Sequence, residues 1–388
     1  MSKKRSIFEE VGTAAPEPAT ATPQGGMIDA GKRGARAGVR VWLIVLFALV
    51  LVMITVGGLT RLTDSGLSIT EWRPLTGAIP PLNAADWAAE FALYQAIPEF
   101  QLQNSWMTLA DFKVIYWWEW GHRQLGRVSG LVWVIGFFGF LAARKIPVGW
   151  TGRLFLLGVL GGIQGAVGWW MVYSGLSDGR LDVASYRLAT HLGLAFIILG
   201  VITWFILQLS REERELMQTR RNRETKLFGL STGWLHFTFL QILIGALVAG
   251  IDAGRNYTDW PLMAGGFFPP DMFALEPWWR NFFEDDGLVQ FIHRMSGYLL
   301  LIFSVVVWRR GRKSANAATR AAFTAAFIAM IAQVALGIYT VVMGAPWNIA
   351  ILHQFLAVVV WCLILRARFH AGYPPPQSVR GTKREARA

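Results

Sequence analysis

Long apolar runs separated by short polar segments dominate this 388-residue chain. A helix needs about 20 predominantly apolar residues to cross the hydrocarbon core of a bilayer. The sixth run is short, but the apolar residues 288–292 directly before it complete a crossing. The pattern predicts an all-α polytopic membrane protein with eight transmembrane helices, at Val41–Leu59, Leu125–Ala143, Leu154–Tyr173, Leu188–Leu209, Trp234–Ile251, His293–Trp308, Ala321–Met343 and Trp347–Leu365.

The composition agrees with this reading, since 54% of the residues are hydrophobic and only 16% are charged. Lys and Arg accumulate in cytoplasmic loops, and here they cluster before the first run and in every second gap after it. Both termini are therefore expected in the cytoplasm, with segments 64–118 and 252–286 on the outer side. Topology alone explains the net charge of +12, so no nucleic-acid partner is expected.

The polar segments suggest a division of the chain. Residues 1–40 contain few large apolar side chains and are expected to form a disordered cytoplasmic tail. Residues 41–210 and 231–366 are each expected to form a four-helix bundle, joined by a cytoplasmic linker at 211–230 and followed by a tail at 367–388. The first run lacks a cleavage pattern and is not read as a removed signal. The single cysteine, Cys362, excludes an intramolecular disulfide.

An internal duplication organises the two halves. Asp64-Ser65-Gly66 corresponds to Asp252-Ala253-Gly254, and the order of motifs after it is shared. Because each half contains an even number of spans, the halves are expected to be parallel repeats. The simplest arrangement is two four-helix bundles side by side. Further matching pairs are His122-Arg123 with His293-Arg294, Gln164 and Gly168 with Gln333 and Gly337, and His191 with His353.

Four of the six histidines belong to this duplication, namely His122, His191, His293 and His353. Each stands near the start of an even-numbered span, so all four are expected near the outer face, two per bundle. A haem iron accepts two imidazoles from facing helices, and each pair could hold one haem. The alternative is interfacial histidines bonded to carbonyls or water. A zinc or di-iron site would require several carboxylates within the spans at ligand spacing. Only Glu119 meets this condition, so a metal ion without a porphyrin is not expected.

One difference separates the two predicted pockets. Glu119 lies one helical turn before His122, whereas its repeat counterpart is Gln290. A carboxylate beside a bound macrocycle could transfer a proton or stabilise positive charge at a carbon being oxidised. An ion pair with Arg123 is the structural alternative. Arg123 and Arg294 could bind haem propionates or lipid phosphates. His236 and His370 lie outside the paired pattern and are expected to be structural or solvated.

Taken together, these residues and the motifs around them resemble the haem A synthase family over roughly residues 57–365. Single motifs would be weak signals, but their order and spacing are specific. The matching motifs are Gly58-Leu59-Thr60-Arg61-Leu62, Ser65-Gly66, Glu71-Trp72, Glu119-Trp120-Gly121-His122-Arg123, Gly126-Arg127, Gln164-Gly165, Gly168-Trp169, Met171-Val172, Ser174-Gly175-Leu176, Arg187 with His191, and Gln290-Phe291-Ile292-His293-Arg294 with Gly297.

The resemblance implies oxidation of the C8 methyl of haem O to a formyl group, by successive hydroxylations and loss of water, to give haem A for terminal oxidases. By the same resemblance His122 and His191 contact the substrate haem, His293 and His353 ligate a haem b, and Glu119 serves catalysis. The implied partners are a haem O synthase, an electron donor and oxidase assembly factors, with the oligomeric state left open. Because the outer loops lack cysteines, the chain resembles the subgroup of proteobacteria and mitochondria. The absence of a transit peptide favours a bacterial inner membrane.

Two other functions compete with this one. A dihaem cytochrome that only transfers electrons would also use paired histidines, although conduction across a bilayer requires haems near both faces. A transporter could be built from parallel repeats, but transporters place polar groups near mid-bilayer, and these spans contain few.

Overall fold

The computed structural model describes residues 33–176 and 180–375, which are mainly helical. Within these residues eight helices are long and apolar enough to cross a membrane, which confirms the predicted all-α polytopic fold. These helices are α1 (Arg33–Leu62), α3 (Leu109–Ala142), α4 (Thr151–Tyr173), α5 (Ser185–Leu209), α7 (Thr225–Gly250), α9 (Asp286–Gly311), α10 (Ala317–Val342) and α11 (Trp347–Gly372). The shorter helices are η1 (Thr76–Ala78), α2 (Ala84–Gln95), η2 (Phe100–Asn104), α6 (Glu213–Arg220), η3 (Ala253–Arg255), η4 (Trp278–Arg280) and α8 (Asn281–Glu284).

Several helices extend beyond the apolar runs that predicted them. The largest extension is in α3, which begins at Leu109 instead of Leu125. Its start is fixed by a capping box, in which the Thr108 hydroxyl accepts from the Asp111 N–H and the Asp111 carboxylate accepts from the Thr108 N–H. Hydropathy does not record a helix that continues through polar residues outside the bilayer.

The same effect changes the ends of the predicted segments. Helix α1 begins at Arg33, inside the predicted tail, and α11 continues to Gly372. The predicted linker at 211–230 contains α6 and the first turns of α7. Residues 1–32 and 376–388 lie outside the described residues, so the predicted disorder of the two tails stays a prediction.

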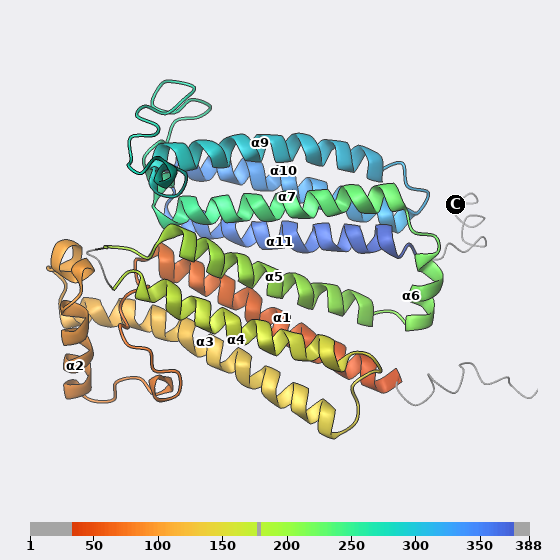
Figure 1. Cartoon of the computed structure of the whole chain (residues 1–388), viewed down its shortest axis with the longest axis horizontal. Coiled ribbons are helices and arrows are strands. Elements are labelled where there is room, and N and C mark those ends of the chain that lie inside the picture. The colour runs from red at the N-terminus through yellow and green to blue at the C-terminus, as the bar shows by residue number, and fades with distance from the viewer. Residues whose placement is uncertain (1–32, 177–179, 376–388) are drawn as a thin grey trace, which may run out of the picture.

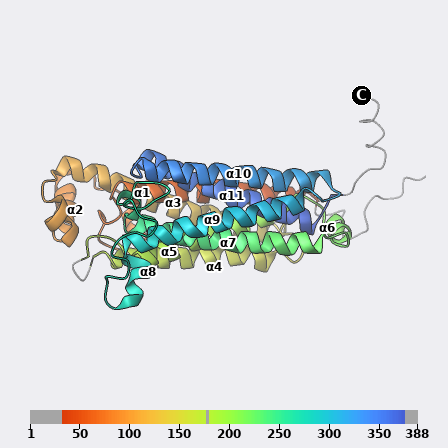
Figure 2. The same ribbon diagram turned by 90° about the horizontal axis from the view of Figure 1, so that it is seen from above.

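The long helices pack in two groups (Figures 1 and 2). In one group α1 packs against α3 and α5, and α4 packs against α5. In the other, α7 packs against α9 and α11, and α10 against α11 and α9. Helix α5 also packs extensively against α7, and α11 contacts both α1 and α5. Because contacts between the groups are as close as many within them, a division into two repeat-related bundles stays an interpretation.

Polar contacts also join the two groups in the apolar interior. The Gln354 side chain of α11 donates to the Ile54 carbonyl of α1 at 2.7 Å. Its amide lies directly against Gly58, where a Cβ atom would come within 2.5 Å of it. The Trp361 indole N–H donates to the Phe196 carbonyl of α5 at 3.0 Å. Such bonds satisfy backbone groups that lipid could not.

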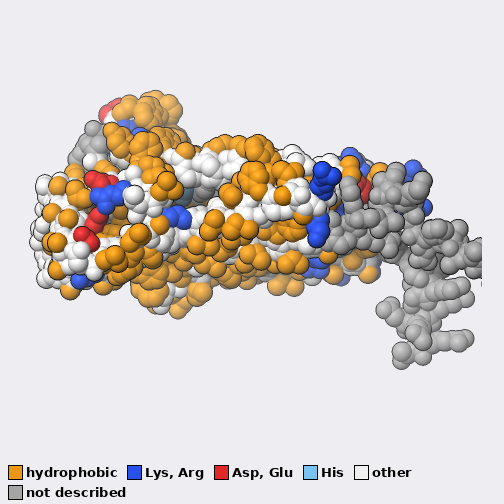
Figure 3. Space-filling model, turned by 90° about the horizontal axis from the view of Figure 1, so that it is seen from below, with side chains coloured by type: hydrophobic (Ala, Val, Ile, Leu, Met, Phe, Trp, Pro, Cys, Tyr) orange, Lys and Arg blue, Asp and Glu red, His pale blue; other side chains and the backbone are white. Residues whose placement is uncertain are grey.

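The two ends of the molecule differ. Helix α2 and the segment from η3 to α8 lie at one end, and α6 lies at the other, together with the beginning of α1 and the end of α11 (Figure 1). Hydrophobic side chains cover much of the surface between these ends on the face in Figure 3. This belt suits contact with lipid chains.

Candidate haem-binding site

The four duplicated histidines all lie toward the end of the molecule that carries α2. His191, His293 and His353 stand within the first eight residues of α5, α9 and α11. His122 is the fourteenth residue of its helix, because α3 begins at Leu109, well before the apolar run. The His122 and His191 rings are close enough for charge on one to affect the other, and so are those of His293 and His353. The structure therefore brings together the pairs that the duplication predicted.

Each of the four rings lies against a glycine of the helix that precedes it in the chain. A Cβ atom at Gly57 of α1 would come within 3.0 Å of the His122 ring, and one at Gly168 of α4 within 2.9 Å of His191. The distances for Gly245 with His293 and Gly337 with His353 are 3.0 and 2.8 Å. Real Cβ atoms essentially never come closer than 3.0 Å to another heavy atom, so an alanine at Gly168 or Gly337 would displace the ring, and one at Gly57 or Gly245 would crowd it.

Three of the four histidines are also held by a glutamine, placed one helical turn before the glycine. Gln164, Gln241 and Gln333 donate to the backbone carbonyls of His191, His293 and His353 at 3.1, 2.9 and 3.0 Å. The same amides lie 3.1–3.3 Å from the imidazole nitrogens. Each glutamine therefore restrains both the backbone and the ring of its histidine, which is how neighbouring side chains orient a metal ligand. In the sequence, Gln164 and Gln333 were recognised as counterparts in the two repeats. Gln241 was not recognised, and the contact of each glutamine with a histidine was not predicted.

Glu119 is buried beside His122 and is fully hydrogen-bonded. Its Oε2 accepts from the Ser68 hydroxyl at 2.8 Å and from the Ile69 N–H at 2.7 Å. Its Oε1 accepts from Nε and Nη2 of Arg123, at 3.0 and 2.5 Å. The carboxylate is therefore fixed in position between α3 and the outer loop. The predicted alternative of an ion pair with Arg123 is present.

Gln290 occupies the equivalent place beside His293. Its Oε1 accepts from Arg294 at 2.8 Å, and its amide donates to the Ala253 carbonyl at 2.6 Å. The geometry repeats that around Glu119, but the negative charge is gone. The side chain one turn before the histidine is thus a carboxylate in the first repeat and a neutral amide in the second.

The two repeated arginines do not have free guanidinium groups. Arg123 donates to the carbonyls of Ile69 and Glu71, at 2.7 and 3.0 Å. Arg294 donates to the Tyr257 carbonyl at 2.7 Å and to those of Asp259 and Leu262. Both residues thus tie an outer loop to the helix that carries a histidine. Their predicted contact with haem propionates stays a prediction.

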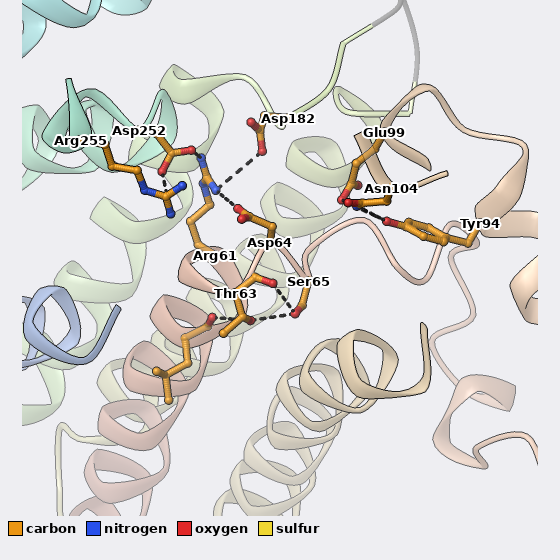
Figure 4. Close-up of polar contacts among 11 residues, drawn as sticks. Arg61, Thr63, Asp64, Ser65, Tyr94, Glu99, Asn104, Asp182, Asp252 and Arg255 are labelled. Atoms are coloured by element: carbon orange, nitrogen blue, oxygen red, sulfur yellow. Dashed lines mark hydrogen bonds and ion pairs between the residues drawn. The ribbon is translucent and has the colours of Figure 1, made fainter. Parts of the chain in front are cut away.

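A charged network joins the two repeats above the histidines (Figure 4). Arg61, at the end of α1, lies 2.8 Å from Asp64 and 2.8 Å from Asp252 of the second repeat, with Asp182 at 3.7 Å. Its side chain is only 12% exposed. Burial raises the pKa of Asp182, although the charge of Arg61 opposes this. Arg61 belongs to a motif of the family resemblance, but its partners Asp182 and Asp252 could not be paired with it from the sequence, because they lie far away along the chain.

A second acidic group stands in the outer loop. Glu99 accepts hydrogen bonds from the Tyr94 hydroxyl and the Asn104 amide, both at 3.2 Å (Figure 4). Its other oxygen is buried without a partner among the described residues. Burial raises the pKa of Glu99 to about 8, and the hydrogen bond from Tyr94 only partly opposes this. No sequence pattern marked this residue.

The donor sets suit haem. Within residues 33–176 and 180–375, no three His, Cys, Asp or Glu side chains gather as ligands of a metal ion. Each pair offers two imidazoles, which is the number a haem iron needs because the porphyrin supplies the other four nitrogens. The glycines leave room for each ring to lie flat against its neighbouring helix. His236 contacts only the Thr232 carbonyl, and His370 lies in the last turn of α11 and not in a polar tail.

Comparison with known proteins identifies the family. Residues 40–365 match the family model of the cytochrome oxidase assembly protein COX15-CtaA. This chain belongs to that family. It is 69% identical to "Heme A synthase" of Ruegeria pomeroyi, over 98% of this chain and 100% of the relative. It is 65% identical to the protein of the same name from Roseobacter denitrificans and 60% identical to that of Paracoccus denitrificans, each over 98% of this chain and 100% of the relative.

Membership of the COX15-CtaA family agrees with the resemblance found in the sequence, and it implies that haem takes part in the function. Together with the eight spans, it makes the chain a multi-pass membrane protein of oxidase assembly. Within this family member, the pairs of histidines are the residues best placed to meet a haem.

Proposed function

We propose that this chain is a haem A synthase that oxidises the C8 methyl of haem O to a formyl group. Two successive hydroxylations convert the methyl to a geminal diol, and loss of water then gives the aldehyde. Three features support the proposal: the relatives' shared name, the two pairs of histidines, and the carboxylate beside only one pair. The proposal depends most on the last observation, because a carboxylate beside one pair suits a pocket where the substrate reacts, and its replacement by an amide suits a pocket that holds a permanent cofactor.

The pocket of His122 and His191 takes the substrate haem. Glu119 lies one turn before His122 and is held by Ser68, the Ile69 N–H and Arg123. A charge fixed by this many donors needs no reorganisation when positive charge develops on a nearby carbon. The carboxylate therefore acts as a preorganised electrostatic group in the oxidation of the methyl.

The pocket of His293 and His353 holds a haem b as resident cofactor. Their imidazoles would ligate its iron, while Gln241 and Gln333 orient the rings. When bound, this haem supplies single electrons. Gln290 replaces Glu119 here, so the side chain one turn before His293 is a neutral amide.

The protein lies in the bacterial inner membrane with both termini in the cytoplasm and the haem sites on the periplasmic side. Basic clusters near α6 and acidic loops near the histidines support this orientation. A haem O synthase supplies the substrate. An electron donor and oxidase assembly factors are the expected further partners.

Pigment analysis tests the proposal directly. The protein is purified from cells with and without a co-expressed haem O synthase, and extracted haems are separated by chromatography. We expect haem b in both preparations, and hydroxylated haem or haem A only with the synthase. Finding haem b alone under both conditions would instead identify a dihaem cytochrome.

Glu119→Gln tests the role of the carboxylate. The amide retains the shape and one acceptor, so the haem b spectrum should persist while haem A formation falls by about 100-fold, as for removal of one preorganised electrostatic group. Gln290→Glu is the matched control and should retain product formation. Loss of haem b from Glu119→Gln would mean that the two pockets are assigned the wrong way round.

A further inference from the structure

The four histidines are not held equally, and the exception lies in the proposed substrate pocket. Gln164, Gln241 and Gln333 each contact a histidine. Within the described residues, the His122 side chain makes no hydrogen bond. The residue one turn before its glycine, where the others have glutamine, is Met53.

Met53 occupies the place of Gln241 in space as well as in sequence. The Gln241 amide nitrogen lies 3.3 Å from the Cβ position of Gly297 on α9. The Met53 Cε lies 3.7 Å from the Cβ position of Gly126, the repeat counterpart on α3. Both side chains therefore reach the same point on the helix that carries the histidine.

A second polar group is also replaced. Ser296 donates to the Gln241 Oε1 at 2.5 Å and to the His293 carbonyl at 3.2 Å, which fixes the orientation of the amide. Its counterpart in the first repeat is Leu125. The polar pair that supports His293 has thus become an apolar pair beside His122.

This difference alters how firmly an imidazole holds iron. A neighbouring side chain that fixes the orientation of an imidazole strengthens its binding to a metal, and loss of such support typically lowers metal affinity by about 10- to 100-fold. A thioether donates no hydrogen bond and accepts only weakly. His122 is therefore the weakest of the four ligands, opposite a His191 that Gln164 holds in place.

We propose that Met53 and Leu125 make His122 an exchangeable ligand of the substrate haem. His122 then dissociates from the iron and leaves a coordination position on the α3 side for a small external ligand, while His191 stays bound. The inference rests on the proposed function, which places the substrate haem in this pocket. Met53 is a positioning residue in this scheme. Two equally firm histidines would leave the iron with no position for an oxygen donor.

Carbon monoxide binding to the dithionite-reduced protein is the test, because CO binds ferrous haem only where an axial ligand leaves. Protein loaded by co-expression with haem O synthase is titrated with CO and followed by absorbance. In the wild type, we expect the first-pocket haem to bind CO and the second-pocket haem b to resist it. Met53→Gln with Leu125→Ser should lower the CO affinity of the first pocket by at least about 10-fold.

Two further variants keep the test decisive. Gln241→Met should create CO binding at haem b, even if the double variant fails to fold. Met53→Leu, which changes shape but adds no donor, should retain wild-type CO affinity. Equal CO affinity in the wild type, the double variant and Gln241→Met would overturn the inference. Haem A formation by the wild type is scored separately, so failure of the proposed function is distinguished from failure here.

Discussion

Gly337→Ala tests whether the close approach of a glycine to a histidine is needed to hold haem. The added Cβ would lie 2.8 Å from the Cε1 of His353 and 3.5 Å from its Nδ1. Ordinary contact starts near 3.4 Å, so the ring would have to move by about 0.6 Å, the difference between these distances. It cannot withdraw freely, because Gln333 bonds the His353 carbonyl and α10 packs along α11.

Overpacking of this kind costs about 1–3 kcal/mol. If the strain falls on the ligand, haem affinity drops by roughly 5- to 150-fold, since 1.4 kcal/mol corresponds to about a factor of ten. The assay is the haem b content per purified protein, with the reduced spectrum reporting the ligands. We expect substoichiometric haem or a shift toward a five-coordinate spectrum.

Gly229→Ala is the matched control, because it lies on α7 in the same group of helices and its Cβ would meet nothing within 4 Å. It should keep full haem content. Full haem content with an unchanged spectrum in Gly337→Ala would refute the reasoning, and so would an equal loss in the control.

Two further predictions concern the outer network. Glu99→Gln should flatten the pH dependence of stability: burial raises the pKa of Glu99 to about 8, so wild-type stability is greatest below the usual carboxyl pKa and is lost as pH rises toward 8. Thermal melting from pH 5 to 8 measures this, and equal slopes for both proteins would contradict it. Arg61→Gln should lower stability by about 1 kcal/mol, because Asp64 and Asp252 lose their ion pairs but are themselves 52% and 32% exposed. An unchanged melting temperature would contradict this prediction.

Much of the fold could be predicted because the bilayer imposes a simple rule. Apolar runs of sufficient length gave the number of spans and the position of His191, His293 and His353 near the starts of their helices. The start of α3 could not be found this way, because its first turns lie outside the apolar run and depend on the capping of Thr108 with Asp111. Hydropathy records only the part of a helix that is in contact with lipid.

The candidate site was predicted less completely than the spans. The duplication paired the histidines and set Glu119 against Gln290, since these differences are visible in an alignment of the two halves. The contacts of Arg123 with loop carbonyls could not be foreseen, because they depend on how segment 69–71 folds back over α3. The role of Gln241 had a visible signal, because a glutamine four residues before a glycine occurs in three of the membrane-spanning helices, α4, α7 and α10.

Two consecutive glycines of α1 have a consequence for communication between the pockets. Gly57 lies against the ring of His122, and Gly58 lies against Gln354, the neighbour of His353 on α11. One turn of a single helix therefore forms part of the wall of both sites. A sliding or tilting of α1 that admits a haem to one site must shift the support of the ligand in the other. Any movement of this turn would therefore disturb the surroundings of His122 and of Gln354 together.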